Sequence, residues 1–208
     1  MHSGRELRLI GLKLPLIKPG DDLAKLIVEA AKSQVGGLLD GDVVVVTSKV
    51  VSKARGYLLD VKRLEREASV KARILAKLTG KPLWQVEGIL RLSRRIVAAV
   101  PVYDILRATE FPLKLSRNPK AALKLLKGDR VMLIAELADG RLASEAGIDT
   151  SNIPEGIAAY PPPDPDKEAR RLREEISKYA GVNVAVIISD TEFSLSRYGS
   201  LDIAIGCS

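Results

Sequence analysis

The sequence predicts a mixed α/β fold, because segments with strand-like patterns alternate with segments of helical periodicity along its 208 residues. Residues 43–47 form a nearly uniform apolar run, which is typical of a strand buried on both faces. Residues 184–191 form a second run of strand length that ends in Asp-Thr. Residues 23–33 carry apolar side chains on one helical face and follow Asp21 and Asp22, which suit an N-terminal cap.

The chain is long enough, and apolar enough at 46% hydrophobic residues, for one domain over 1–208 or two small lobes. The other elements expected are strands over 7–12, 96–102 and 201–205, helices over 64–78, 82–92, 121–126 and 167–179, and a hairpin of 130–137 with 141–144. Gly140 supplies the Asp-Gly turn of that hairpin, Gly80 suits the end of the first of these helices, and Asp166 can cap the last.

Three segments between these elements have distinctive composition. The loop over 14–20 is stiff, since each proline fixes its own φ and restricts the residue before it. Residues 103–128 are basic, carry no obvious chemistry and are interpreted as an insertion or an interaction surface. The proline run over 161–165 predicts a rigid, extended connector.

The rare residue types exclude several classes of function. Cys207 is the single cysteine, so no internal disulfide can form, and a reducing cytoplasm is the expected compartment. His2 is the single histidine and lies near the chain end, which argues against a histidine base or a histidine-ligated zinc. Any metal site must therefore use oxygen ligands, which favour magnesium, manganese or calcium. No apolar run approaches the ~18 residues needed to span a bilayer.

The net charge of +7 suggests an anionic partner such as a nucleotide, phosphate or nucleic acid. The alternative is a heat-adapted surface, because 28% of the residues are charged while glutamine and asparagine are scarce. A nucleic-acid stripe is disfavoured, since Trp84 is the only aromatic residue near the basic face of Arg91, Arg94 and Arg95.

The stretch Ala146-Gly147-Ile148-Asp149-Thr150-Ser151-Asn152 holds an acidic residue where a plain turn needs none. The apolar run that ends in Asp190-Thr191 provides a second acid. We predict that Asp149, Asp190 and Thr191 converge on one divalent cation. The alternative is two turn-forming aspartates without a shared task.

A polar cluster follows the apolar run over 43–47. It consists of two hydroxyl groups and two ammonium groups, on Ser48, Ser52, Lys49 and Lys53. Such a cluster at the end of a buried strand could hold a triphosphate, whereas solvated side chains are the alternative interpretation.

Several blocks together resemble the coenzyme F-420-0:γ-glutamyl ligase family. The matching blocks are Leu14-Pro15-Leu16-Ile17 with Gly20-Asp21-Asp22-Leu23, Gly41-Asp42-Val43 through Ser52-Lys53, Ala146-Gly147-Ile148-Asp149 with Ser151-Asn152, Pro161-Pro162 with Asp164-Pro165-Asp166, and Ser189-Asp190-Thr191. Their order and spacing agree over most of 7–206, apart from the 103–128 insertion.

The resemblance implies a fold special to that family, with mixed sheets and flanking helices, in a chain that is usually a homodimer. It also implies a reaction in which GTP phosphorylates a carboxylate of the deazaflavin precursor. The amine of L-glutamate then attacks the acyl phosphate to give an amide. A triphosphate needs divalent cations, here Mg or Mn, to spread its charge.

The resemblance also implies roles for individual residues. Leu14, Pro15, Leu16 and Ile17 would line the guanine site, and Ser48, Lys49, Lys53 and Asn152 would contact the nucleotide. Asp149 and Asp190 would be the catalytic acids that bind one metal, and Thr191 would bind a second.

The chain departs from the family pattern at several positions. Arg55 stands where a glutamate is common, which inverts the charge in a phosphate site, and Tyr57 stands where an arginine is common. Phe193 and Ser194 replace a Gly-Arg pair, and Ser144-Glu145 replace small or amide residues. Relatives are expected to continue for some tens of residues beyond the position of Ser208, with further metal and nucleotide contacts in that tail.

Three functions therefore remain open at this point. The first is a GTP- and metal-dependent γ-glutamyl ligase, or a related amide-forming enzyme with a changed acceptor. The second is a non-catalytic descendant that binds a nucleotide or a protein partner. The third, disfavoured by the scarcity of aromatic residues, is a basic nucleic-acid-binding protein.

Overall fold

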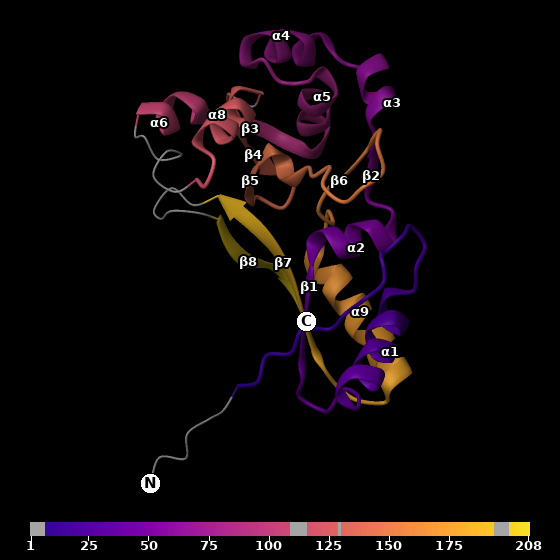
Figure 1. Cartoon of the computed structure of the whole chain (residues 1–208). Coiled ribbons are helices and arrows are strands. Elements are labelled where there is room, and N and C mark those ends of the chain that lie inside the picture. The colour runs from indigo at the N-terminus through magenta and orange to yellow at the C-terminus, as the bar shows by residue number, and fades with distance from the viewer. Residues whose placement is uncertain (1–6, 109–115, 129, 194–199) are drawn as a thin grey trace. The chain divides into compact units, whose positions relative to one another are not determined.

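A computed structural model describes residues 7–108, 116–128, 130–193 and 200–208 (Figure 1). The chain divides into two compact units. Unit 1 comprises Met1–Gly56, Pro165–Ser189 and Ala204–Ser208, and unit 2 comprises Tyr57–Asp164 and Asp190–Ile203. Secondary structure is mixed in both units, so the predicted α/β class is confirmed.

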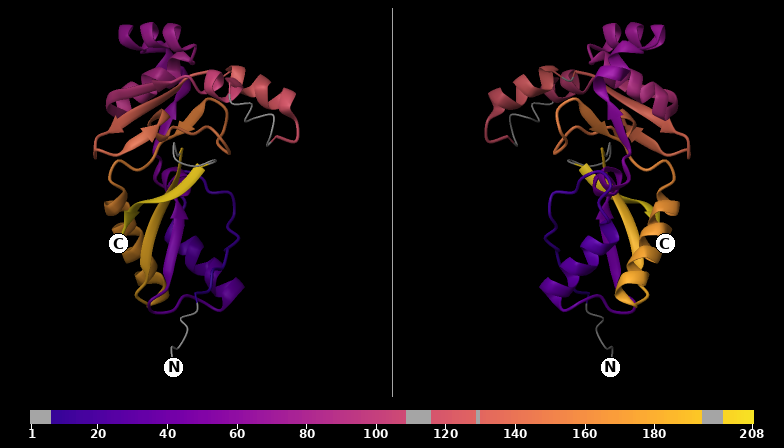
Figure 2. Two further views of the ribbon diagram at one scale, coloured as in Figure 1. Left: turned by 90° about the vertical axis from the view of Figure 1, so that its left-hand side faces the viewer. Right: turned by 90° about the vertical axis from the view of Figure 1, so that its right-hand side faces the viewer.

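Unit 1 is built on a three-stranded sheet in the order β1-β7-β8. Its elements are α1 (Leu23–Val35), β1 (Val43–Thr47), α2 (Ser48–Arg55), α9 (Pro165–Ala180), and the unit 1 portions of β7 (Ala185–Phe193) and β8 (Ser200–Cys207). Strand β1 runs parallel to β7, with Val43 opposite Ala185 and Thr47 opposite Ser189. Helices α1 and α9 pack side by side (Figures 1 and 2).

The core of unit 1 joins one face of this sheet to the helices. It contains Leu23 and Ile27 of α1, Leu172 and Ile176 of α9, and Val186 and Ile188 of β7. Burying such side chains is worth about 1.5–3 kcal/mol each, so the apolar periodicity of each helix determines which face packs inward.

Three predictions for unit 1 were wrong. Strand β1 is not buried on both faces, because Val43 and Val45 are 54% and 58% exposed while Val46 is 8% exposed. Residues 7–12 form no strand, and their leucines at 7 and 9 are largely exposed. Asp166 does not cap α9, since the helix begins one residue earlier and the Asp166 carboxylate accepts a hydrogen bond from the Cys207 N–H at 2.8 Å.

Unit 2 contains two small antiparallel sheets and several short helices. Its elements are β2 (Leu58–Asp60), α3 (Val61–Arg66), α4 (Val70–Thr79), α5 (Leu83–Leu92), β3 (Ser93–Val100), α6 (Val102–Ala108), α8 (Pro119–Gly128), β4 (Met132–Leu137), β5 (Leu142–Ser144), the 3-10 turn η1 (Glu145–Gly147) and β6 (Ile157–Ala159). The sheets are β3-β4-β5 and β2-β6. The hairpin of β4 and β5 confirms the Asp-Gly turn.

The helix predicted over 64–78 is in fact two helices. Helix α3 ends at Arg66, and Ser69 caps α4 by accepting a hydrogen bond from the Ala72 N–H at 3.1 Å. The Ser69 N–H and Oγ both donate to Glu87 of α5, at 2.9 and 2.8 Å. The break was missed because the apolar spacing continues through it, although Ser69 is a residue type that favours the N-cap position.

Candidate active site

The predicted site residues divide between the two units. Unit 1 holds Leu14, Pro15, Leu16, Ile17, Ser48, Lys49 and Lys53. Unit 2 holds Asp149, Asn152, Asp190 and Thr191.

In unit 1 the polar cluster that follows β1 lies on helix α2. Helix α2 follows β1 without an intervening residue and begins at Ser48, which is 5% exposed. Ser48 and Ser52 lie one turn apart, as do Lys49 and Lys53, so hydroxyl and ammonium groups form neighbouring rows. The first turn of a helix presents unpaired N–H groups that attract anions. This arrangement could bind phosphate oxygens. Lys53, however, is only 8% exposed and already interacts with other groups of the protein.

The loop over 14–17 packs beside this helix. Ile17 is buried and shares a hydrophobic cluster with Val51 and Ala54 of α2. The Gly20 N–H donates to the Ala54 carbonyl at 3.0 Å. Leu16, by contrast, is 70% exposed. The structure therefore brings two of the predicted blocks together within unit 1, and the guanine contacts remain a prediction.

The Arg55 side chain forms ion pairs with two glutamates of α9. Its Nε lies 3.1 Å from Glu168 Oε2 and its terminal nitrogen 2.5 Å from Glu175 Oε2. Burial alone would lower the pKa of Arg55, but hydrogen bonds and charges from Glu175 and Glu168 raise it above its ordinary value. Arg55 places a positive charge where the family commonly has a glutamate, and two carboxylates of α9 balance this charge.

In unit 2 the stretch around Asp149 begins with an unusual backbone. Glu145, Ala146 and Gly147 have successive φ values of +54°, +53° and +71°, in the left-handed region. A Cβ on Gly147 would lie 2.4 Å from Pro161 Cγ and 3.9 Å from Asp190 Oδ2. Only glycine fits this approach, and the Asp190 carboxylate lies directly beside the turn.

Asp149 follows this turn in a fixed backbone position. Its N–H donates to the Ala159 carbonyl at 2.9 Å and its carbonyl accepts from the Ala159 N–H at 2.8 Å. Its Oδ1 accepts a hydrogen bond from the Ser151 N–H at 2.6 Å, as in a side-chain-capped turn. Asn152 is exposed with a φ of +57°. The two predicted segments thus meet at Gly147.

The shared cation remains a prediction. Asp149 and Asp190 offer hard oxygen atoms, the donor type that Mg and Mn prefer. Among the residues that the structure describes, no group of three or more His, Cys, Asp or Glu side chains is arranged to hold a metal ion. Two aspartates would therefore need substrate or water oxygens to complete the coordination.

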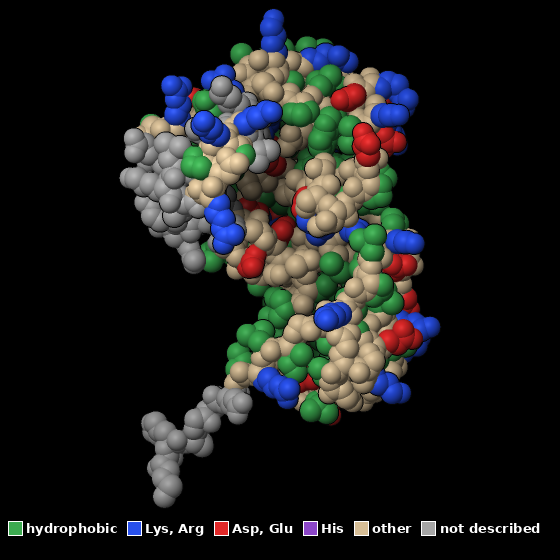
Figure 3. Space-filling view, viewed as in Figure 1, with side chains coloured by type: hydrophobic (Ala, Val, Ile, Leu, Met, Phe, Trp, Pro, Cys, Tyr) green, Lys and Arg blue, Asp and Glu red, His purple; other side chains and the backbone are tan. Residues whose placement is uncertain are grey.

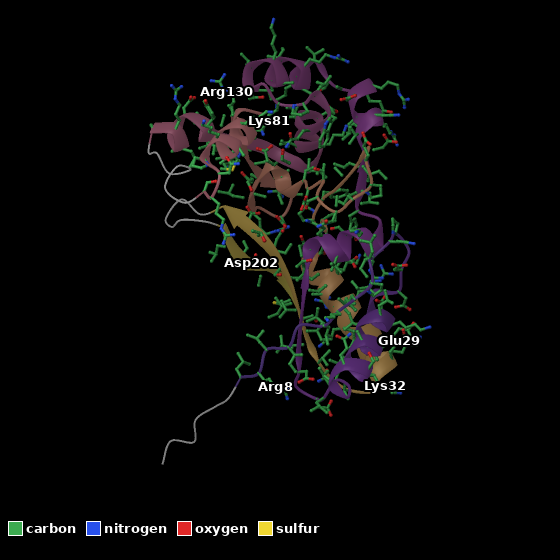
Figure 4. All side chains as sticks on the ribbon, viewed as in Figure 1. Arg8, Glu29, Lys32, Lys81, Arg130 and Asp202 are labelled. Carbon is green, nitrogen blue, oxygen red and sulfur yellow. The ribbon has the colours of Figure 1, made fainter. Side chains whose placement is uncertain are left out.

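Sequence reasoning missed two acids, one in contact with Thr191 and one influenced by the charge of Asp190. Thr191 Oγ1 donates to Asp202 Oδ1 at 2.6 Å, and Asp202 is labelled on β8 in Figure 4. Glu192 is half-buried, and burial together with the charge of Asp190 raises its pKa. The alternation of strand residues could have placed Glu192 on the Asp190 face, whereas Asp202 required the β7–β8 pairing.

The surface of unit 2 has a small recess and a dispersed set of basic side chains. A recess of about 60 Å³ lies beside the turn, far smaller than the roughly 300–1,000 Å³ typical of ligand pockets. Its lining consists of Leu92, Leu137, Ala138, Asp139, Arg141, Ala146, Tyr160, Pro161, Pro162 and Pro163. Figure 3 shows Lys and Arg side chains spread over α4, α6 and α8 rather than gathered in one stripe. Arg130 follows α8, and its guanidinium carbon lies 5.5 Å from the centre of the Tyr103 ring on α6.

Comparison with known proteins places these features in a family. The family model described as F420-0:Gamma-glutamyl ligase matches residues 11–208. Relatives named "Coenzyme F420:L-glutamate ligase" come from Methanopyrus kandleri, 36% identical over 92% of this chain and 62% of the relative, and Archaeoglobus fulgidus, 36% identical over 94% and 64%. A third, from Methanocaldococcus jannaschii, is 32% identical over 98% and 68%.

The chain therefore spans a little under two thirds of the length of the first two relatives. None of the helices that the structure describes is long and apolar enough to cross a membrane. The match to the family model extends over nearly the whole chain. The chain belongs to the F420-0:gamma-glutamyl ligase family.

Proposed function

We propose that this protein joins L-glutamate by an amide bond to coenzyme F-420-0 or a related deazaflavin carboxylate, using GTP and a divalent cation. The names of its relatives support the glutamate and deazaflavin substrates. The observation that carries the proposal is the approach of the Asp190 carboxylate to the Gly147 turn, which leads directly to Asp149.

The chemistry follows from the substrates. The acceptor carboxylate attacks the γ-phosphorus of GTP, and GDP leaves. The glutamate amine then attacks the acyl carbon, phosphate leaves with the C–O electron pair, and the amine loses a proton. A bound Mg or Mn ion would spread the charge of the triphosphate and of the transferring phosphoryl group.

The residues of this chain would bind and orient rather than react covalently. Asp149 and Asp190 would hold the cation, with Thr191 as a ligand to a second ion. Ser48, Lys49 and Lys53 on α2 and Asn152 in unit 2 would hold the nucleotide, with Leu14, Pro15, Leu16 and Ile17 at its guanine. Ammonium groups and helix N–H groups supply the positive field that phosphate oxygens need.

A direct assay tests the proposal. Purified protein is incubated with GTP, Mn²⁺, L-glutamate and the deazaflavin precursor, and the amide product is followed by mass spectrometry. We expect product and GDP in equal amounts. Nucleotide binding without turnover would instead support the non-catalytic alternative, and absence of both would reject the proposal.

Asp190→Asn sharpens this test. We expect Mn²⁺ affinity, measured by calorimetry, to fall by more than the ~10–100-fold that loss of an outer hydrogen-bond partner costs. The melting temperature in metal-free buffer should stay within a few degrees. Asp104→Asn, at an exposed position of α6, is the matched control and should bind as the unmodified protein does. A large loss of stability without metal would show that Asp190 is structural.

A homodimer is part of the proposal. One face of the unit 1 sheet leaves Val43 and Val45 more than half exposed, and Ile187 pairs with Val45 on the neighbouring strand. A second copy would bury this apolar surface. Light scattering after gel filtration should give twice the chain mass, and Val45→Glu should give a monomer. A monomeric unmodified protein would remove this part of the proposal.

A further inference from the structure

Lys81 is an unusual residue in unit 2, because its side chain is 1% exposed. It follows Gly80, which ends α4, and precedes α5; Figure 4 labels it. Its Nζ lies 3.0 Å from Glu145 Oε1. A buried ammonium is costly unless it is paired and hydrogen-bonded, so a lysine at this position calls for an explanation beyond solubility.

The Glu145 carboxylate accepts hydrogen bonds from a strand and a helix as well as pairing with Lys81. Besides Lys81, its Oε1 accepts the N–H of Leu133 in β4 at 2.8 Å. Its Oε2 accepts the side-chain amide of Gln85 in α5 at 3.1 Å. The carboxylate thus ties the start of the turn to a strand and to a helix at once.

This carboxylate belongs to the first residue of the left-handed turn. A left-handed φ costs a non-glycine residue about 1–2 kcal/mol, and Glu145 and Ala146 adopt it in succession. Ala146 is also 1% exposed in the core beside Leu133. Such a backbone persists only where its surroundings hold it, and the buried ion pair does so.

We propose that Lys81 is a positioning residue of the candidate active site. Its ammonium holds the Glu145 carboxylate, which holds the turn, and the turn sets where Asp149 lies relative to the Asp190 carboxylate. This inference rests on the proposed function for its consequence in metal binding. Its structural part, the control of the turn by Lys81, can be tested without metal or substrate.

The key variant is Lys81→Met, which keeps an unbranched side chain one atom shorter and removes its charge. Hydrogen exchange in metal-free buffer should quicken at least tenfold at the Ile148 and Asp149 amides, which donate to Glu145 and Ala159. Amides of β1 and β7 in unit 1 should be unchanged. Lys77→Met, the same substitution at an exposed position of α4, should change neither set.

Metal binding provides the functional measurement. We expect Lys81→Met to weaken Mn²⁺ binding about tenfold, as loss of an outer positioning partner does, and Lys81→Arg to recover part of it. A lower melting temperature with unchanged exchange at the turn and unchanged Mn²⁺ affinity would overturn the inference. If Lys81→Met does not fold, as judged by circular dichroism, Glu145→Gln tests the same link and should shift both measurements in the same direction.

The two proposals can fail separately. If the unmodified protein binds Mn²⁺ and Lys81→Met binds it equally, the inference fails and the proposed function stands. If the unmodified protein binds no Mn²⁺, the proposed function fails and so does the role of Lys81 in metal binding. In that case faster exchange in Lys81→Met supports its control of the turn alone, and unchanged exchange removes that as well.

Discussion

Each unit contains a basic side chain, largely or fully buried, that pairs with carboxylate groups, and the two arrangements have different consequences. In unit 1, Arg55 on α2 pairs with Glu168 and Glu175 on α9. In unit 2, Lys81 pairs with Glu145 at the start of a left-handed turn. The first pairing joins α2 to α9, two helices of regular backbone. The second holds a backbone that the local sequence would not adopt unaided.

The difference shows that similar ion pairs have different consequences when they are broken. Loss of Arg55 removes a cation from the buried Glu168 and the partly exposed Glu175, so the cost falls on stability. Loss of Lys81 releases a strained segment, so the cost falls on the position of the groups that follow it.

The largest effect on stability is expected for Arg55→Met. Removing one partner of a buried ion pair costs about 3–5 kcal/mol when the other charge stays buried, and Glu168, with 8% of its side chain exposed, is such a charge. Urea unfolding should show this loss. Arg171→Met is the matched control, because Arg171 reaches the same Glu175 at 3.1 Å from an exposed position and should cost less than about 0.5 kcal/mol. Equal losses for the two variants would contradict the comparison.

A smaller but more local effect is expected for Gly147→Ala. The added methyl group would meet Pro161 at 2.4 Å, and overpacking of this kind costs about 1–3 kcal/mol. Gly140→Ala is the control, because its φ is also positive at +87° and nothing lies within 4 Å of the new carbon. The difference in unfolding free energy between the two variants isolates the close approach. A difference near zero would mean that the turn readily moves away from Pro161.

The smallest effect concerns pH. Burial and the charge of Asp190 raise the pKa of Glu192, so the folded protein binds this proton more tightly than the unfolded chain does. Protonated Glu192 therefore contributes to the free energy of unfolding. This contribution is fully present below its ordinary pKa of about 4.3 and is lost as the pH rises through the raised pKa. Glu192→Gln should gain stability relative to the unmodified protein between pH 4 and pH 7, by less than about 1 kcal/mol. Parallel stability curves in metal-free buffer would contradict this.

The sequence was a good guide where a pattern repeats locally. The helices at 23–35 and 83–92 and the β4–β5 hairpin follow from periodicity and turn residues. It failed where the outcome depends on distant partners. Apolar residues alternate on both sides of β1, but only one face of the strand meets a helix layer among the described residues, so the expectation of two buried faces was wrong.

The candidate site shows the same division. The polar cluster after β1 and the two acids could be identified from residue types, and the structure brings Asp190 to the turn before Asp149. The left-handed conformation of Glu145 and Ala146 could not be predicted, because those residue types rarely adopt it. The ion pair between Lys81 and Glu145 joins positions 64 residues apart, so no local sequence pattern predicts it. The Phe193-Ser194 departure extends beyond the described residues at position 194.

The single cysteine and the single tryptophan lie in different units. Cys207 is exposed in the unit 1 portion of β8, and Trp84 lies on α5 of unit 2. A dye attached to the thiol would therefore report on one unit while intrinsic fluorescence reports on the other, without any substitution. Coincident denaturation curves from the two signals would identify one cooperative transition, and separated curves would show that the units melt independently.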